Sequence, residues 1–554
     1  MGVSSNPTMV FDLQPLVAAV PGLEELALPF QRSEIDEIVK HMPTDKAPGP
    51  DGFNGMFVKR CWQTIKYDFY ALCKEFYNGT ASLECINSSY ITLERMQHLA
   101  STFGCQVGTL PFTYLGLPMR TTKPRIEDLS PIMGRVERRL SACSTWLSYS
   151  GRLQMVNSAI TPIVTYTLCT IKVPKGFIEN IDRARKQCLW RGNDDTARGG
   201  NLVAWTTVMQ PKEKWGLGVI NLRLQNDALL LKQLHKFYNK ADVPWVQLIW
   251  NKYYEGKVPH ECRELGSFWW RDVMRLNVIY RGIAQCSLGD GSTVSFWDDH
   301  WSGSVLSVQY PRMHSFARNS SKSVHSLMME QDQEDIFFLP LSIEAHEELL
   351  QLQSYLEDIE YDGSAADVWS PIWGAKYSSR KFYAHVFSGI EAHPFYKALW
   401  KSSCTLRIKF FAWLILVDRL NTKTMLRRRH LNIQDDTLCV LCATGIEEDI
   451  DHLFFGCPFA LQCWSSINFT WDNSLPLTER FVKAKDVHGL DFFTEASLIS
   501  AWELWKLRND KIFQRRDPTT AIWLANFKNQ CMLQSVRFKD DLRSSFCFWL
   551  DAFS

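Results

Sequence analysis

The chain has 554 residues, of which 46% are apolar and 13% aromatic. A chain of this length and apolar content can bury the cores of several domains, which excludes a wholly disordered protein. Lys and Arg total 61 against 60 Asp and Glu, and the formal net charge of +1 excludes a uniformly basic molecule. A role on nucleic acid would therefore require local basic surfaces.

The sequence also indicates a reducing compartment. Sixteen cysteines are scattered along the chain rather than spaced as a disulfide framework. The first residues show no charged segment followed by an apolar one, and no run of about 18 uncharged apolar residues occurs. We expect free thiols and an intracellular protein, in the nucleus or cytoplasm, that is neither secreted nor bound to membranes.

Helical periodicity dominates the chain from its start to residue 240. Apolar residues recur at helical spacing in four segments, residues 12–42, 53–76, 125–191 and 223–240. Within the third segment, new helices are expected near Ser150 and Gly176. The pattern predicts a mainly α fold with small β elements, an α+β class, in which residues 46–52 form a Pro- and Gly-rich loop and residues 87–93 alternate like a strand.

The near-zero net charge is a sum of blocks of opposite sign. Residues 120–191 carry 13 basic and 5 acidic side chains, residues 401–429 carry 8 and 1, and residues 327–368 carry 12 acidic and no basic ones. Such blocks create local fields that the total charge hides. For each block, a solvated helix face is the simpler alternative.

The strongest chemical signal is a set of three cysteines and one histidine. Cys439 and Cys442 form a C-x₂-C pair, His452 follows after nine residues, and Cys457 after four more. Zinc prefers four such ligands in a tetrahedron, and a closed set leaves no position for catalysis, so the spacing predicts a structural Zn²⁺ site. Cys463 is a competing fourth ligand, and ordinary buried thiols are the other alternative.

Cations interleave with apolar residues beside this motif and in the first basic block. This mixture is expected where one face of a helix packs and the other meets phosphate, although an ordinary amphipathic helix has it too. The predicted nucleic-acid contacts are Arg135, Arg138, Arg139, Arg407, Lys409, Arg427, Arg428 and Arg429.

Ten short segments, in this order, resemble the reverse transcriptase of plant LINE-type (non-LTR) retrotransposons. They are DKAPGPDGF (45–53), CW (61–62), NSSYITL (87–93), FTYLGLPM (112–119), WLSYSGRLQMVNSAI (146–160), PKEKWGLGVINL (211–222), GDGSTVSFWDDHW (289–301), FFAWL, DRLNT and the cysteine–histidine motif. The resemblance extends from about residue 10 to about residue 540. In that family the last motif belongs to the reverse transcriptase zinc-binding domain.

The resemblance implies six parts of a truncated polymerase. They are a remnant of the fingers (1–93), a remnant of the end of the palm (94–120), a helical thumb- or connection-like region (121–242), a Trp-rich connecting region with the acidic stretch (243–375), the reverse transcriptase zinc-binding domain (376–470) and a helical C-terminal tail (471–554).

The resemblance implies that the palm of the polymerase is missing. Polymerases of this family hold two divalent ions with an Asp of one palm strand and an Asp pair in a Y/F-x-D-D hairpin. Here the segment 94–111, between ITL and FTYLGLP, contains Glu94 as its single acid, and a palm needs on the order of 100 residues. We therefore predict a deleted catalytic section, no catalytic residue and no Mg²⁺.

One F-x-D-D sequence does occur, at Phe296–Asp299. It lies after the family's YLGLP segment rather than before it, and no partner Asp is placed for it. We interpret it as an aromatic strand leaving the Gly289-Asp290-Gly291 turn, with Asp298 and Asp299 capping the next segment of the chain.

Three functions are compatible with these observations. The first is a zinc-containing protein that binds RNA or DNA and cannot polymerise. The second is an active RNA-directed DNA polymerase, a nucleotidyltransferase, with an unrecognised site. The third is a pseudogene-like or host-retained interaction protein without an enzymatic role.

Overall fold

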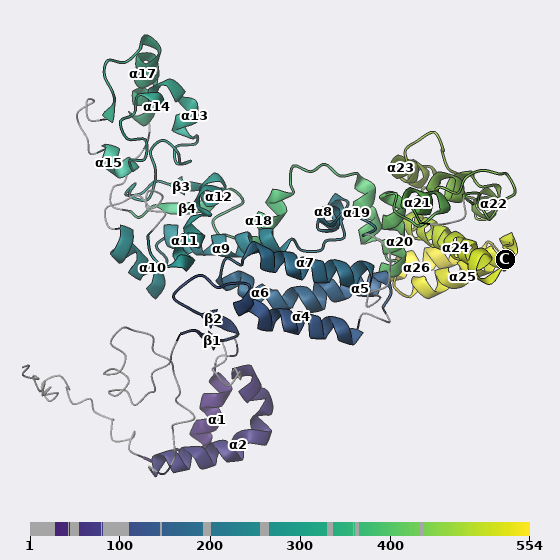
Figure 1. Ribbon diagram of the computed structural model, residues 1–554, viewed down its shortest axis with the longest axis horizontal. Coiled ribbons are helices and arrows are strands. Elements are labelled where there is room, and N and C mark those ends of the chain that lie inside the picture. The colour runs from purple at the N-terminus through teal and green to yellow at the C-terminus, as the bar shows by residue number, and fades with distance from the viewer. Residues whose placement is uncertain are drawn as a thin grey trace, which may run out of the picture. The chain divides into compact units, whose positions relative to one another are not determined.

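The computed structural model describes residues 28–42, 44, 55–78, 80, 110–143, 147–191, 201–254, 265–328, 336–357, 359, 365–431 and 436–553. It consists of two compact units, residues 1–122 and 123–554 (Figure 1). Helices make up most of the described residues of each unit, and the described strands form two small two-stranded sheets. This confirms the predicted mainly α class. The loop expected at 46–52 and the strand expected at 87–93 lie outside the described residues.

The described residues of the first unit form two helices and one hairpin. Its elements are α1 (Arg32–His41), α2 (Gly55–Tyr77), β1 (Phe112–Tyr114) and β2 (Leu117–Met119). Asp36 joins the helices, because its carboxylate accepts hydrogen bonds from the Trp62 indole and the Tyr70 hydroxyl at 2.8 and 2.6 Å. In the antiparallel hairpin, Leu115 and Gly116 both have positive φ, of 50° and 78°, as a two-residue type I′ turn requires. The YLGLP sequence is therefore a tight hairpin.

The second unit begins with a group of packed helices. They are η2 (Glu127–Leu129), α4 (Ser130–Cys143), α5 (Tyr149–Met155), the π segment η3 (Val156–Ile160), α6 (Thr161–Thr170), α7 (Lys175–Trp190), α8 (Trp205–Val208), η4 (Lys212–Lys214) and α9 (Leu222–Tyr238). The starts expected at Ser150 and Gly176 are each found one residue earlier. Leu129, Ile132 and Val136 are at most 1% exposed, so the predicted apolar stripe is the buried face. The helix expected at 223–240 is α9.

The middle of the second unit has a hydrophobic core of its own. Its elements are α10 (Pro244–Ile249), the π segment η5 (Trp250–Tyr254), α11 (Phe268–Met274), α12 (Asn277–Gly282), β3 (Ala284–Ser287), α13 (Leu306–Gln309), α14 (Pro311–Ser315), α15 (Val324–Met328), α17 (Ile343–Glu357), β4 (Val368–Pro371) and α18 (Ser379–Val386). Strands β3 and β4 pair antiparallel, with Ala284 opposite Pro371. In α17, Ala345 and Leu349 are buried while Glu344 and Glu347 are exposed, so this part of the acidic block is a solvated helix face.

A buried carboxylate holds the Gly-Asp-Gly turn in this core. Asp367 accepts hydrogen bonds from the backbone N–H groups of Gly289, Gly291 and Thr293 at 2.8–2.9 Å. A Cβ at Gly289 would come within 2.5 Å of the carbonyl oxygen of Ala365, so this position requires glycine.

The strand expected after that turn is not formed. Ser295 makes an isolated bridge with Ser323, and Phe296 to Asp298 form a turn. The reason is packing, because Phe296 and Trp297 are both fully buried, whereas neighbouring side chains of a strand point to opposite faces. Asp299 accepts the Ser295 N–H and pairs with Arg281 in the interior, and Asp298 is exposed.

The C-terminal part packs on the same core as α4–α8. Its elements are α19 (Pro394–Lys401), α20 (Leu406–Leu416), α21 (Lys423–Arg428), the π segment η7 (His452–Gly456), α22 (Pro458–Ser466), α23 (Leu477–His488), α24 (Phe493–Gln514), α25 (Thr520–Ser535) and α26 (Asp540–Asp551). Tyr149 stacks on Phe410 with centroids 5.8 Å apart, and the Trp413 indole donates to the Trp215 carbonyl at 2.7 Å. None of the described helices is long and apolar enough to cross a membrane.

Candidate metal centre

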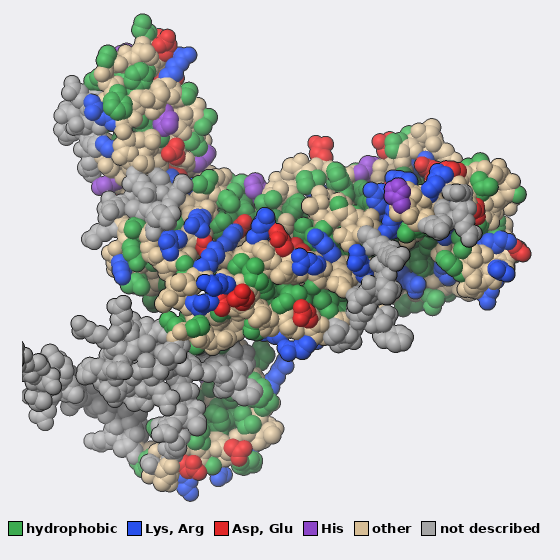
Figure 2. All heavy atoms as spheres, in the orientation of Figure 1, with side chains coloured by type: hydrophobic (Ala, Val, Ile, Leu, Met, Phe, Trp, Pro, Cys, Tyr) green, Lys and Arg blue, Asp and Glu red, His purple; other side chains and the backbone are tan. Residues whose placement is uncertain are grey.

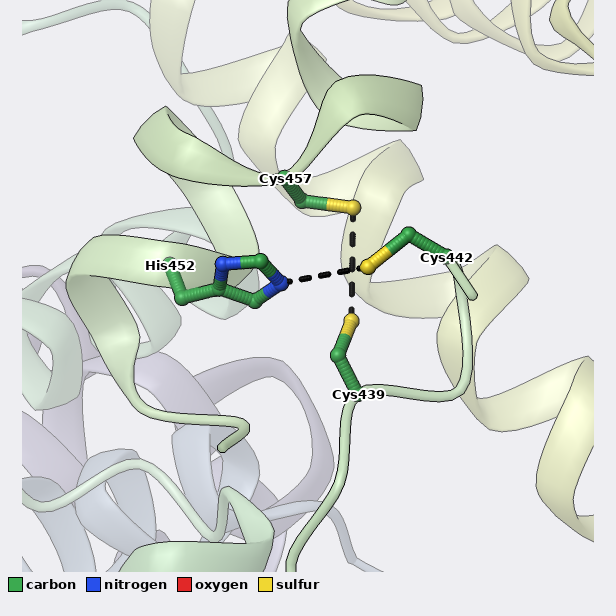
Figure 3. Close-up of side chains that lie close together, drawn as sticks. All are labelled: Cys439, Cys442, His452 and Cys457. Carbon is green, nitrogen blue, oxygen red and sulfur yellow. Dashed lines mark hydrogen bonds between the residues drawn. The ribbon is translucent and has the colours of Figure 1, made fainter. Parts of the chain in front are cut away.

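Two short pieces of backbone bring the four predicted zinc ligands together. Cys439 and Cys442 lie in a turn closed by two backbone hydrogen bonds, Cys439 N–H to Ile446 and Glu448 N–H to Thr437. His452 opens η7, and Cys457 is the residue that precedes α22. Figure 3 shows the three sulfur atoms and the imidazole pointing toward one another. His452 begins η7 and Cys457 directly follows it, so this one short segment brings two ligands to the first cysteine pair.

The distances fit one tetrahedral metal ion. The sulfur atoms of Cys439 and Cys457 are 4.0 Å apart, the Cys442 sulfur is 3.3 Å from Nε2 of His452, and all four donor atoms lie within 4.8 Å of one another. Zinc bonds of about 2.3 Å to sulfur and about 2.0 Å to nitrogen place the corners of a tetrahedron about 3.5–3.8 Å apart. Three thiols and one imidazole are also the donor chemistry of structural zinc sites. The four residues therefore form a structural Zn²⁺ site, as the spacing predicts.

The surroundings favour the metal-binding forms of His452 and Cys457, whereas the hydrogen bond to Cys457 and burial raise the pKa of Cys439. Burial lowers the pKa of His452, against the opposing charges of Asp449 and Glu448, so the imidazole stays neutral and Nε2 keeps its lone pair. A hydrogen bond from the Cys439 thiol lowers the pKa of Cys457, which favours its thiolate. Asp449 also fixes the start of η7 by accepting the His452 N–H at 2.7 Å. With four protein ligands the site has no open position, which makes its role structural.

A buried ion pair, which sequence reasoning missed, anchors this turn. The Glu448 carboxylate is fully buried and accepts hydrogen bonds from the Arg508 guanidinium of α24 at 2.5–3.2 Å and from the Lys423 N–H of α21 at 3.0 Å. Arg508 is itself only 4% exposed and lies 4.8 Å from the Trp505 ring centroid. No sequence signal pairs residues 60 positions apart, and Glu448 lies in what the sequence presents as a polar turn.

Cys463 is not part of the donor set. It lies in α22 and is fully buried, and burial raises the pKa of its thiol to about 12. The described metal-ligand group contains Cys439, Cys442, His452 and Cys457. Cys463 is therefore a buried thiol outside the metal site, and Cys457 is the fourth ligand, as the spacing predicts.

The predicted cations of the first basic block lie on the outer side of α4. Arg135, Arg138 and Arg139 are exposed, while Ile132 and Val136 of the same helix face the core. More cations lie on the neighbouring helices, and Figure 2 shows Lys and Arg side chains gathered over α7 and α9. The exposed or half-buried cations of these two helices are Lys175, Arg183, Lys186, Arg223, Lys232 and Lys236. The cations of α9 lie outside residues 120–191, the first basic block of the sequence.

The cations predicted at α20 are partly engaged in local contacts. The Arg407 guanidinium is exposed and lies 5.2 Å from the Trp502 ring centroid. Lys409 is half-buried, donates to the Trp400 carbonyl at 3.0 Å, and has its pKa lowered by burial.

The three consecutive arginines after α20 each contact an acceptor elsewhere in residues 418–447. Arg427 forms a bidentate pair with Glu447 at 2.7 and 2.9 Å, and Arg428 contacts Asp418 at 2.6 Å. Arg429 is half-buried and donates to the Asn421 side chain at 3.2 Å. The Arg427–Glu447 pair neutralises one charge of the basic block at residues 401–429, in which Asp418 is already counted, so the surface field of this block is slightly weaker than the sequence indicates.

Comparison with known proteins also identifies a zinc-binding domain in this part of the chain. Residues 377–464, which contain all four ligands, match the family described as zinc-binding in reverse transcriptase. The chain is 23% identical to the Arabidopsis thaliana "Putative ribonuclease H protein At1g65750" over 360 residues, 63% of this chain and 57% of that protein. It is 26% identical to the Arabidopsis thaliana "Uncharacterized mitochondrial protein AtMg00310" over 141 residues, 24% of this chain and 90% of that protein. The chain thus spans little more than half of the first relative. These matches support a retrotransposon origin and identify a reverse-transcriptase-associated zinc-binding domain.

Proposed function

We propose that the chain is a LINE-type reverse transcriptase remnant that binds RNA or DNA and does not polymerise. The zinc-binding domain and the relatives support its origin, and the order of its sequence segments supports the LINE type. The binding proposal depends on one observation above all. The two basic blocks, more than 200 residues apart in sequence, belong to segments that share one hydrophobic core.

This shared core makes the two basic segments one rigid support. Tyr149 of α5 stacks on Phe410 of α20, and the Trp413–Trp215 hydrogen bond joins α20 to the loop after η4. The zinc site and the Glu448–Arg508 pair fix the turn next to α21 on the same support. Cations held on rigid helices can contact phosphates at fixed spacing without a large loss of side-chain entropy. A nucleic-acid backbone is the ligand that this charge distribution favours.

Loss of polymerase activity is supported by the acids that remain. The segment 94–111 has Glu94 as its single acid, too few for a two-metal site. Asp299 of the F-x-D-D sequence is buried against Arg281, and its orientation is fixed by the Ser295 N–H. A buried carboxylate that already pairs with an internal guanidinium is poorly placed to bind two catalytic metal ions.

Primer extension tests the catalytic half of the proposal. The full chain should not extend a DNA primer on an RNA template with Mg²⁺ or Mn²⁺. Extension that is lost in Asp298→Ala/Asp299→Ala would instead place an active site at that sequence. Extension that persists in this variant would point to a different site and would equally contradict the proposal.

Binding to an RNA and a DNA hairpin tests the other half. Changing Arg135, Arg138 and Arg139 to Gln should weaken binding at 50 mM salt, because exposed cations on α4 would contact phosphates. Arg543→Gln, an exposed cation of α26 outside both basic blocks, is the control and should bind like the unchanged chain. Equal affinity in the triple variant would exclude α4 from the interface.

A further inference from the structure

A pocket lies where α5 meets α20 and α24. Its volume is about 370 Å³, within the size range of small-ligand sites. The pocket lies on the boundary between the first helix group and the zinc-binding domain, so both basic segments border it. We call it the Trp–Arg pocket after the side chains that dominate its wall, which are Tyr149, Phe411, Trp502, Trp505, Arg152 and Arg407.

The aromatic wall offers flat surfaces that remain partly open. Trp502 and Trp505 are three residues apart on α24, so they share one face of that helix. Both are half-buried and both contact the buried Phe411, at centroid distances of 5.1 and 6.2 Å. Tyr149 also lines the pocket, is 37% exposed and stacks on Phe410, which is another lining residue. Aromatic rings that remain partly exposed in the wall of a pocket suit the stacking of a flat ligand.

The polar part of the wall is positive. Arg407 lies over Trp502, and Arg152 lies over Tyr149 with its guanidinium carbon 5.6 Å from the ring centroid. Nε of Arg152 is buried and has no hydrogen-bond partner among the described residues. No carboxylate is found among the described residues that line the pocket. Two guanidinium groups in a wall without a carboxylate favour an anionic ligand.

A second hollow shares the tryptophans and Arg407 with this pocket. Its volume is about 410 Å³, and its wall includes Lys506, Asn509 and the carboxylate Asp510 of α24 and Gln530 of α25. The aromatic ridge formed by Trp502 and Trp505 is therefore open on two sides. A ligand longer than one flat ring can continue across it.

We propose that the Trp–Arg pocket binds an unpaired nucleotide of a single strand, with its base between Tyr149 and the two tryptophans and its phosphate on Arg152 or Arg407. This proposal rests on the nucleic-acid binding proposed above and adds a place and a mode of recognition. An apolar peptide would use the rings equally well but would leave the guanidinium groups of Arg152 and Arg407 without an anion. A nucleotide supplies both the flat ring and the anion.

Two variants separate stacking from charge. Binding of a 15-nucleotide single strand, as RNA and as DNA, is measured between 50 and 200 mM salt for the full chain, for Tyr149→Leu and for Arg407→Gln. Tyr149→Leu should weaken binding about 10-fold with an unchanged salt slope, because stacking involves no counterion. Arg407→Gln should weaken binding and reduce the slope of log affinity against log salt by about 0.7. Tyr149→Phe keeps the ring and should bind normally.

Tyr166→Leu on α6 is the matched control, since Tyr166 is 47% exposed and lies outside the pocket. Circular dichroism of each variant checks that the fold is kept, and photocrosslinking of a 5-iodouridine strand to the unmutated chain gives an independent readout. Crosslinks at Tyr149, Trp502 or Trp505 support the pocket.

The outcomes separate this proposal from the broader one. If the unchanged chain binds, but both pocket variants bind like Tyr166→Leu and the crosslinks lie elsewhere, the pocket is excluded while nucleic-acid binding stands. If the unchanged chain binds neither strand nor hairpin at 50 mM salt, both proposals fail. A preference for RNA over DNA would indicate that the sugar 2′-hydroxyl is also recognised.

Discussion

Glu448 and Arg508 form an ion pair in which both side chains are almost completely removed from solvent, at 0% and 4% exposure. Glu448 belongs to the turn that carries the first two zinc ligands, and Arg508 belongs to α24. The pair therefore ties the metal centre to the longest helix of the C-terminal part. Zinc closes the turn, and the ion pair fixes the closed turn to the core.

Glu448→Gln should destabilise this part of the protein strongly. The amide can still accept the Lys423 N–H, but it leaves the Arg508 charge buried without a counter-ion, at a cost of about 3–5 kcal/mol. The measurement is the urea midpoint at which the zinc-loaded chain releases its metal to an indicator. Glu447→Gln removes the exposed partner of Arg427 and should change the midpoint little. Equal midpoints for the two variants would mean that the buried pair does not anchor the turn.

The ligand set predicts one zinc ion per chain. Cys442→Ser and His452→Ala should each reduce the zinc content well below one equivalent, because each removes one of four ligands. Cys463→Ser removes a buried thiol outside the set and should keep full zinc content. Elemental analysis of the purified variants gives the comparison. A folded chain that contains no zinc, or a loss in Cys463→Ser equal to that in Cys442→Ser, would contradict the assignment.

Asp299 should make the stability of the middle core depend on pH. Burial raises the pKa of Asp299 to about 6, although Arg281 and the Ser295 N–H oppose the shift, whereas an unfolded Asp has a pKa of about 3.9. Because the folded state holds the proton more tightly, the resulting stabilisation is complete below about pH 4 and is lost as the pH rises through 6. Between pH 4.5 and 6.5 this group should lower the free energy of unfolding by about 2 kcal/mol.

Urea unfolding of Asp299→Asn at these two pH values tests that dependence. Asn cannot ionise, so the change between the two pH values should be smaller by about 2 kcal/mol than in the unmutated chain. Asp298→Asn, at the exposed neighbouring position, should keep the original dependence. An unaltered pH dependence in Asp299→Asn would show that another group titrates.

The features that depend on local spacing could be predicted from the sequence. The starts of α5 and α7 lie within one residue of the expected positions, and the spacing of Cys439, Cys442, His452 and Cys457 was sufficient to assign the zinc site. Both depend on residues close together in the chain, where periodicity and ligand spacing are decisive.

The features that depend on distant neighbours could not be predicted. The turn at Phe296 and Trp297 forms because both rings enter the same core, which their alternation in sequence does not reveal. Glu447, which lies outside the basic block of residues 401–429, also pairs with Arg427, whose charge the sequence presents as free. Burial and pairing across the fold decide these points, and a single sequence contains no direct signal of either.

The salt dependence of hairpin binding by the zinc-loaded chain tests the central claim most directly. If the basic segments on one core form a nucleic-acid surface, the logarithm of the affinity should fall linearly with the logarithm of salt concentration, by about 0.9 for each phosphate contacted on a duplex. Several contacts should then weaken binding at least 10-fold between 50 and 200 mM salt. No binding at 50 mM, or an affinity that salt does not change, would contradict the claim.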